Sequence, residues 1–167
     1  PPALPLILYA VVAQIPIEDI FIGGILPGIL LTTMVAAWGV RELYLTGGEP
    51  FLLADVDTIV RACVDALPTT VLTNGMVFHG RGRRALESLP RKGFALQISL
   101  DSATSDLHDA HRGVGSWQKA VDGIRLALSL GFRVRVAATI AAPAPRQLDD
   151  LHRFLDELGI AADDQVI

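Results

Sequence analysis

From residue 41 onward, short strand-forming runs alternate with stretches of helical periodicity, and this alternation constrains the fold more than any other feature. Strands are predicted where apolar and β-branched residues cluster, at 42–46, 69–73, 95–100 and 132–139. Helices are predicted where apolar residues recur every three or four positions, at 55–67, 82–89, 116–131 and 146–159. Strand–helix–strand repetition favours a parallel sheet with right-handed crossovers, so the expected fold class is α/β.

The first 40 residues have a different character. All 14 Lys and Arg residues lie at or after Arg41, whereas residues 1–40 carry only Glu18 and Asp19 as charged residues. The uncharged run 20–40 is about as long as the roughly 20 residues that cross a bilayer core. A membrane-associated segment and a buried hydrophobic helix or strand pair are both consistent with this pattern. We therefore expect two parts, a hydrophobic, transmembrane-like helical segment at 1–38 and an α/β domain at 39–167.

Charge and cysteine content exclude several kinds of function. The net charge of −4 does not favour a nucleic-acid partner. Cys63 is the one cysteine, so neither an internal disulfide nor a cysteine metal cage is available, and no metal ligand set is predicted. Its position on the apolar face of a predicted helix suggests an inert, buried thiol. A cytoplasmic location is expected for the α/β domain, and a membrane location only if the N-terminal segment is genuine.

Small and polar residues follow each predicted strand. The first strand runs into Thr46-Gly47-Gly48-Glu49-Pro50, the second ends at Thr73-Asn74-Gly75, and the third ends at Ser99-Leu100-Asp101-Ser102. In an α/β barrel, the carboxyl ends of the strands form the active face. Ordinary turn chemistry also places such residues at strand ends. The order and spacing of the segments together favour a ligand site.

Four segments, VRELYLTGGEPFLL, VLTNGM, QISLDSATSDLHDAHRGVGSW and GFRVRVAATI, resemble the radical S-adenosylmethionine (SAM) superfamily over residues 38–160. Within it they are most similar to the branch that modifies peptides or builds cofactors. The resemblance implies a partial (β/α) TIM-like barrel with parallel strands. It also implies SAM and a four-iron four-sulfur cluster as cofactors, reductive cleavage of SAM, and hydrogen abstraction from an unknown substrate such as a peptide.

The resemblance assigns cofactor contacts to two loops. The segment Thr46-Gly47-Gly48-Glu49 would hold the amino group of SAM, since backbone carbonyls and a carboxylate suit an ammonium ion. Glu49 is a direct ligand in one interpretation and a structural hydrogen-bonding residue in the other. Thr73 and Asn74 would line the pocket, although Asn74 also fits a plain Asn-Gly turn.

The third loop would hold the SAM carboxylate. Ser99 and Arg112 resemble the family pair for this group, and a guanidinium binds a carboxylate through parallel charged hydrogen bonds. The alternative for Arg112 is a surface pair with Asp109. Asp101 is expected either to cap the following turn or to contact substrate. The neighbouring His108 and His111 are predicted to be solvated loop residues, and no catalytic residue is assigned.

The sequence departs from the family in one major respect. The family cluster is held by a Cys-x3-Cys-x2-Cys loop after the first strand, and this loop would lie upstream of Arg41, where no cysteine occurs. We therefore expect this chain to be inactive as written, a fragment of a radical SAM enzyme. A SAM-binding module without chemistry is one alternative.

A membrane transport fragment is the other alternative. PPALPLILYAVVAQIPIEDIFIGGILPGILL, about residues 1–32, resembles the large permease subunit of TRAP-type transporters. A natural fusion of one permease hairpin to a barrel has little physical rationale. The expectation is a chimeric gene model, an assembly error or a joined fragment, with its junction between Leu31 and Trp38. If genuine, residues 1–38 would bring the chain to a membrane, and they are not expected to supply a strand beside 42–46.

Overall fold

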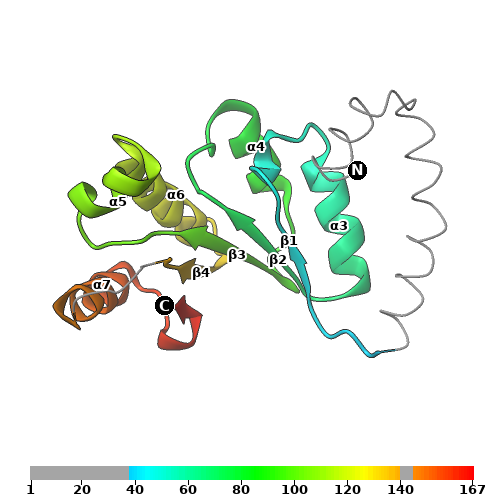
Figure 1. Ribbon diagram of the computed structural model, residues 1–167. Helices are drawn as coiled ribbons and strands as arrows, with labels where there is room; N and C mark the ends of the chain where they lie inside the picture. Colours follow the sequence, from blue (N-terminus) through cyan, green and yellow to red (C-terminus); the bar gives the residue numbers. More distant parts are fainter. Residues whose placement is uncertain (1–37, 140–144) are drawn as a thin grey trace, which may run out of the picture. The chain divides into compact units, whose positions relative to one another are not determined.

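A computed structural model describes residues 38–139 and 145–167 of the protein (Figure 1). The chain divides into two compact units, Pro1–Arg41 and Glu42–Ile167, and the second contains every element discussed below. The predictions made for residues 1–37, including the hydrophobic helical segment and its resemblance to a permease, lie outside the described residues. Within the described ranges, no helix is long and apolar enough to cross a membrane.

Five parallel strands form one sheet in the order β1-β2-β3-β4-β5. They are β1 (Leu43–Leu45), β2 (Thr69–Thr73), β3 (Phe94–Ser99), β4 (Arg133–Ala137) and β5 (Gln165–Val166). The four predicted strands are confirmed as parallel neighbours in chain order. The strand β5 was not predicted, because two residues carry no periodicity. Its pairing with β4 is nevertheless parallel, and Ala138 N donates to Val166 O at 3.1 Å.

Helices alternate with these strands, as the periodicity predicted. They are α3 (Val56–Ala66), α4 (Gly80–Ser88), α6 (Ser116–Ser129) and α7 (Pro145–Leu158), each within two residues of its expected limits. A further helix, α5 (Ser105–Arg112), and two short 3-10 helices, η1 (Pro50–Leu52) and η2 (Ala162–Asp164), were not predicted. The sequence of α5 lacks an apolar stripe because the residue that it buries is His108, whereas its Leu107 is 42% exposed. The α/β, partial TIM-like barrel fold is confirmed.

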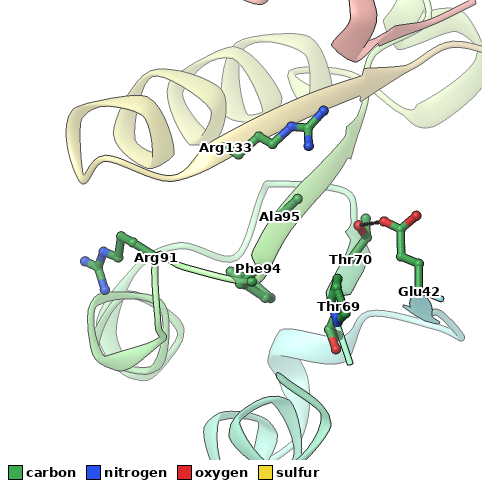
Figure 2. A pocket seen from close by; sticks show the side chains of 9 residues that line it. Glu42, Thr69, Thr70, Arg91, Phe94, Ala95 and Arg133 are labelled. Atoms are coloured by element: carbon green, nitrogen blue, oxygen red, sulfur yellow. Dashed lines mark hydrogen bonds between the residues drawn. The ribbon is translucent and has the colours of Figure 1, made fainter. Parts of the chain in front are cut away.

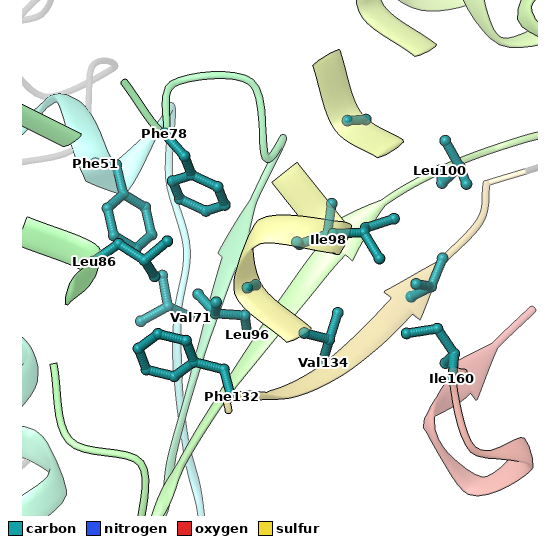
Figure 3. Packing of buried hydrophobic residues seen from close by; sticks show 14 of the residues in the cluster. Phe51, Val71, Phe78, Leu86, Leu96, Ile98, Leu100, Phe132, Val134 and Ile160 are labelled. Atoms are coloured by element: carbon teal, nitrogen blue, oxygen red, sulfur yellow. The ribbon is translucent and has the colours of Figure 1, made fainter. Parts of the chain in front are cut away.

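The hydrophobic core lies between the helices and one face of the sheet. The strand register aligns Leu45, Val71, Leu96 and Val134 in one row across four strands. Figure 3 shows Leu86 of α4 beside Val71 and Leu96 of the sheet. Other apolar residues of the helices belong to the same cluster, including Ile124, Leu151 and Leu155, all fully buried. Thr69 and Thr73 of β2 lie on the same face as Val71 and are buried with it, so this face is mainly but not wholly apolar. The core therefore fixes where each strand ends, and thereby where the polar residues that follow are placed.

The other face of the sheet is concave and polar. Arg135 Nη1 donates to the Tyr44 hydroxyl at 2.8 Å, and this hydroxyl donates to Glu42 Oε2 at 2.9 Å. Tyr44 is on β1 and Arg135 on β4, with two strands between them. Three strand spacings of roughly 4.8 Å would separate β1 from β4 by about 14 Å in a flat sheet, so curvature helps the two side chains to meet. We call this contact the Tyr44–Arg135 bridge.

Candidate functional site

A hollow of about 240 Å³ lies at the carboxyl edge of the sheet, where the active face of an α/β barrel is found. Seven of the nine predicted site residues line it, together with Leu72: Thr46, Gly47, Gly48, Thr73, Asn74, Ser99 and Arg112. Leu72 was missed because it is apolar. Its alternation with Thr70 and Asn74 on the same strand face was the signal that would have identified it. Three loops separated in sequence therefore converge on one hollow, which we call the carboxyl-edge hollow.

The first loop turns sharply after β1. Gly47 has a φ of 147°, a backbone conformation that residues with a Cβ rarely adopt. Glu49, immediately beyond, does not line the hollow. Its Oε1 accepts from Thr73 Oγ1 at 2.7 Å and from Phe51 N at 3.2 Å, and its Oε2 accepts from Asn74 N at 2.9 Å. Both carboxylate oxygens are thus engaged in holding the first loop to the second, which is the structural role anticipated as one alternative for Glu49.

The second loop is a hydrogen-bonded turn that packs against α6. Asn74 Oδ1 accepts from Met76 N at 2.8 Å, and Thr73 Oγ1 accepts from Gly75 N at 3.1 Å. A Cβ placed on Gly123 of α6 would lie 2.1 Å from the Gly75 carbonyl oxygen. Thr73 and the oxygen of Asn74 therefore serve the turn itself, and α6 supports the turn from behind.

The third loop presents Ser99 and Arg112. Ser99 ends β3, and its hydroxyl has no hydrogen-bond partner within the described ranges. Arg112 ends α5 with its side chain 31% exposed. Its Nε and Nη2 donate to the two carboxylate oxygens of Asp101, the second at 3.0 Å. These two residues therefore keep donors free at the edge of the hollow.

Asp101 lies behind the hollow and joins three elements. Besides Arg112, its Oδ1 accepts from Thr139 N at 3.0 Å, just after β4, and its backbone N donates to Nδ1 of His108 at 3.1 Å. Burial by itself raises the pKa of Asp101, but hydrogen bonds from Arg112 and Thr139 outweigh burial and hold that pKa below its usual value. Asp101 is therefore an ionised partner of Arg112.

One expectation and one alternative for this loop were wrong. His108 is not a solvated loop residue, because it lies on α5 with 1% of its surface exposed and Nδ1 accepting a backbone hydrogen bond. Burial lowers the pKa of His108, which favours the neutral ring. Arg112 does not pair with Asp109. Instead, Asp109 accepts from Gly115 N at 2.6 Å and Trp117 N at 2.8 Å, and so caps the start of α6. His111 is exposed, as expected, although on a helix.

A second hollow, of about 210 Å³, lies at the opposite, amino edge of the strands (Figure 2). Its charged residues already have partners. Arg91 Nε donates to Leu130 O at 3.1 Å, Arg133 pairs with Asp164 at 2.7 Å, and Glu42 accepts from Thr70 Oγ1 at 2.8 Å. The amino face of such barrels serves stability. The carboxyl-edge hollow is therefore the better candidate for a ligand site.

The residues present do not fit the iron–sulfur cluster that the resemblance implies. Such clusters are held by cysteine thiolates, and Cys63 is the one cysteine of the 167 residues. It lies on α3 and is half-buried, whereas a buried thiol was expected. Among the described residues, no group of three or more His, Cys, Asp or Glu is placed to hold a metal.

Comparison with curated proteins gives relatives in two biosynthetic systems. The chain is 39% identical to molybdenum cofactor biosynthesis protein 1 of Drosophila melanogaster over 103 residues, which is 59% of this chain and 17% of that protein. It is 31% identical to the antilisterial bacteriocin subtilosin biosynthesis protein AlbA of Bacillus subtilis over 126 residues, 74% of this chain and 28% of that protein. The chain thus spans less than a third of either relative.

Solved structures show the same fold. Streptococcus suis SuiB bound to its precursor peptide SuiA superposes with a TM-score of 0.63 at 21% identity, covering 78% of this chain and 29% of SuiB. The enzyme anSMEcpe with bound AdoMet and a peptide superposes with a TM-score of 0.56 at 15% identity, over 71% of this chain and 35% of that one. The Radical SAM superfamily matches residues 30–158, beginning eight residues before the expected start at 38. The chain belongs to the radical SAM superfamily.

Proposed function

We propose that the carboxyl-edge hollow binds the amino-acid end of SAM, and that the chain is the SAM-binding part of a radical SAM enzyme. The observation that supports this proposal is the convergence of seven motif residues from three loops on one hollow. The volume of about 240 Å³ is below the roughly 300–1,000 Å³ of pockets that enclose a drug-sized ligand. A hollow of this size suits the methionine moiety rather than the whole cofactor.

Each free group in the hollow matches one charge of that moiety. The guanidinium of Arg112 keeps Nη1 and one hydrogen of Nη2 for the SAM carboxylate, and the Ser99 hydroxyl supplies a further donor. Backbone carbonyls of the Gly47-Gly48 turn would accept from the SAM ammonium, since no Cβ keeps the ligand away. Glu49 holds the first and second loops together and so keeps the two halves of the hollow in register.

In this superfamily, SAM bound to a cluster supplies the radical that abstracts hydrogen from substrate. The residues present here do not fit the cluster, so the proposed activity of this chain is SAM binding, and the redox step belongs to the parent enzyme. A SAM-binding module without chemistry is the second candidate function, and the single cysteine favours it.

The names of the relatives support a substrate class for the parent enzyme. One relative acts in molybdenum cofactor biosynthesis and another in the biosynthesis of the bacteriocin subtilosin. We propose that the parent enzyme acts on a peptide or on a cofactor precursor. Feeding such candidates to a longer chain that carries the cluster loop, with product detection by mass spectrometry, tests this part.

The proposal is tested by measuring the binding of SAM and of decarboxylated SAM to wild type and to Arg112→Ala. Arg112→Ala is expected to weaken SAM binding by about 1.5–3 kcal/mol, the usual contribution of a charged hydrogen bond. Decarboxylated SAM, which lacks the group that Arg112 would hold, is expected to bind wild type and Arg112→Ala equally. Isothermal titration calorimetry of the full chain measures both affinities.

Arg125→Ala is the matched control. Arg125 is exposed on α6 and makes a surface ion pair with Asp122 at 3.9 Å, outside the hollow. Its removal is expected to leave SAM affinity unchanged. Equal affinity of Arg112→Ala and wild type for SAM would contradict the assignment of Arg112, and wild type that binds no SAM would contradict the proposed function as a whole.

A further inference from the structure

Arg112 is held by a partner that the sequence motif did not reveal. The Nε–Nη2 side of its guanidinium is taken by both carboxylate oxygens of Asp101. Arginine has five N–H donors, so this fork uses two and leaves the two of Nη1 and one of Nη2. Within residues 38–139 and 145–167, no group bonds Nη1. The fork therefore orients the free end of the guanidinium, and Arg112 lines the hollow in this arrangement.

Asp101 is itself fixed from two sides. Thr139 N donates to its Oδ1 at 3.0 Å, and its own backbone N donates to Nδ1 of buried His108 at 3.1 Å. The carboxylate is 7% exposed, whereas the Arg112 side chain is 31% exposed. A buried and immobile acceptor thus holds a long side chain that would otherwise move freely at the surface.

We propose that Asp101 is a positioning residue, which with His108 behind it aims the free end of the Arg112 guanidinium at the ligand carboxylate. This inference rests on the proposed function for the identity of the ligand, and it assigns a role to Asp101 that the motif left open between turn cap and substrate contact. Asp101 then acts through Arg112 and touches neither SAM nor substrate.

Two effects of Asp101 on an anionic ligand oppose each other. Its negative charge partly neutralises Arg112 and so disfavours a second carboxylate. Its fork restricts the rotamers of Arg112 before the ligand arrives, and ordering a free arginine side chain costs conformational entropy. The ligand carboxylate is farther from Asp101 than Arg112 is, and it lies beside solvent, where charge interactions are weak. Positioning is therefore expected to outweigh repulsion.

The decisive variant is Asp101→Asn, which preserves the shape of the side chain and the oxygen that accepts from Thr139 N. It replaces Oδ2, the acceptor of the Arg112 Nε–H, with an amide group that cannot accept, so that only the weaker hold of Nη2 on Oδ1 remains. We expect SAM affinity to fall about tenfold in the full chain, because binding then includes the cost of ordering the arginine. In an Arg112→Ala background, the same substitution is expected to change affinity less than about twofold, because its effect passes through Arg112.

A second measurement needs no ligand. The Arg112 Nε–H signal in a ¹⁵N–¹H spectrum is identified by its loss in Arg112→Lys. We expect this hydrogen to exchange slowly with solvent in wild type and rapidly in Asp101→Asn. Unchanged backbone amide shifts would show that Asp101→Asn is folded. His108→Asn keeps an acceptor near the position of Nδ1 and is expected to preserve the slow exchange. His108→Phe removes the acceptor and is expected to accelerate exchange, which tests the support if Asp101→Asn fails to fold.

The results separate the two proposals. Unchanged Nε–H exchange in Asp101→Asn, a rise in SAM affinity, or an equal loss of affinity in the Arg112→Ala background would each overturn the positioning role. If wild type binds no SAM, the proposed function fails, and the exchange of the Arg112 Nε–H alone then decides whether Asp101 holds this side chain.

Discussion

Glu49 offers the sharpest test of how the hollow is assembled. Its carboxylate receives three hydrogen bonds, two of them from backbone N–H groups, at 2.7, 2.9 and 3.2 Å. A hydrogen bond to a charged group contributes about 1.5–3 kcal/mol, and bonds to one half-buried carboxylate overlap in their effects. We therefore expect Glu49→Ala to lower the free energy of unfolding by about 2–4 kcal/mol in total.

Glu49→Gln provides an intermediate case. The amide keeps one acceptor oxygen and loses the other together with the charge, so we expect a loss of about 1–2 kcal/mol. For a chain of this size, 1 kcal/mol corresponds to roughly 2–4 °C in Tm, which places Glu49→Ala about 5–15 °C below wild type. Urea unfolding followed by circular dichroism gives the free energies, and unchanged m-values would show that the two variants unfold from equally compact states.

Glu87→Ala is the control for this series. Glu87 is an exposed glutamate on α4 whose ion pair with Arg83 spans one helical turn, an interaction that contributes about 0.3–0.5 kcal/mol. If Glu49→Ala were as stable as Glu87→Ala and yet bound SAM weakly, Glu49 would be a direct ligand and the structural account of its three hydrogen bonds would be refuted.

Three further predictions concern packing, pH and the cluster. Gly123→Ala should lower the free energy of unfolding in urea by about 1–3 kcal/mol, because the new Cβ would collide with the Gly75 carbonyl oxygen. Alanine has the higher helix propensity, so a variant more stable than wild type would contradict this close contact. Burial lowers the pKa of His108, so as pH falls the histidine is protonated in the unfolded state before it is protonated in the folded state, and the free energy of unfolding should decrease below about pH 6.5. His108→Asn should lack this pH dependence of stability, and an equal dependence in both proteins would exclude His108 as its source. Anaerobic incubation with iron and sulfide should leave no stable four-iron cluster, and iron analysis finding about four irons per chain would refute the argument from a single cysteine.

The regular part of the fold could be predicted because its signals are local. The strands β1 to β4 and the helices α3, α4, α6 and α7 each carry their own periodicity. Two elements could not be found in this way. The strand β5 is defined by two residues that pair with β4, and α5 buries a histidine where a helix ordinarily buries an apolar residue. Both depend on contacts in space that the periodicity of the sequence does not reveal.

The candidate site divides in the same way. Most residues that line the hollow lie at or just after the end of a strand, so strand prediction was enough to place them at one edge. Arg112 ends α5, and motif order alone indicated its place. The roles behind the hollow could not be predicted, because they depend on which donors and acceptors meet in space. The partner of Arg112 is Asp101, 11 residues away, rather than the nearby Asp109 of the motif. The proposed domain boundary near residue 38 and the artificial junction stay predictions, which a genomic DNA read across codons 25–45 would test.

The Tyr44–Arg135 bridge has a consequence for the order in which the chain acquires its structure. Its two residues lie 91 positions apart, so β1 can pair with β2 long before the hydroxyl of Tyr44 has its arginine. Contacts between such distant positions form late because closing the intervening chain costs entropy. During synthesis, the Tyr44 hydroxyl can donate to the neighbouring Glu42 early, but it gains Arg135 as a donor only after residue 135 has left the ribosome and β4 has docked. Tyr44 is still 48% exposed in the folded protein, so its hydrogen bond from Arg135, rather than burial, marks the point at which this face of the sheet is complete.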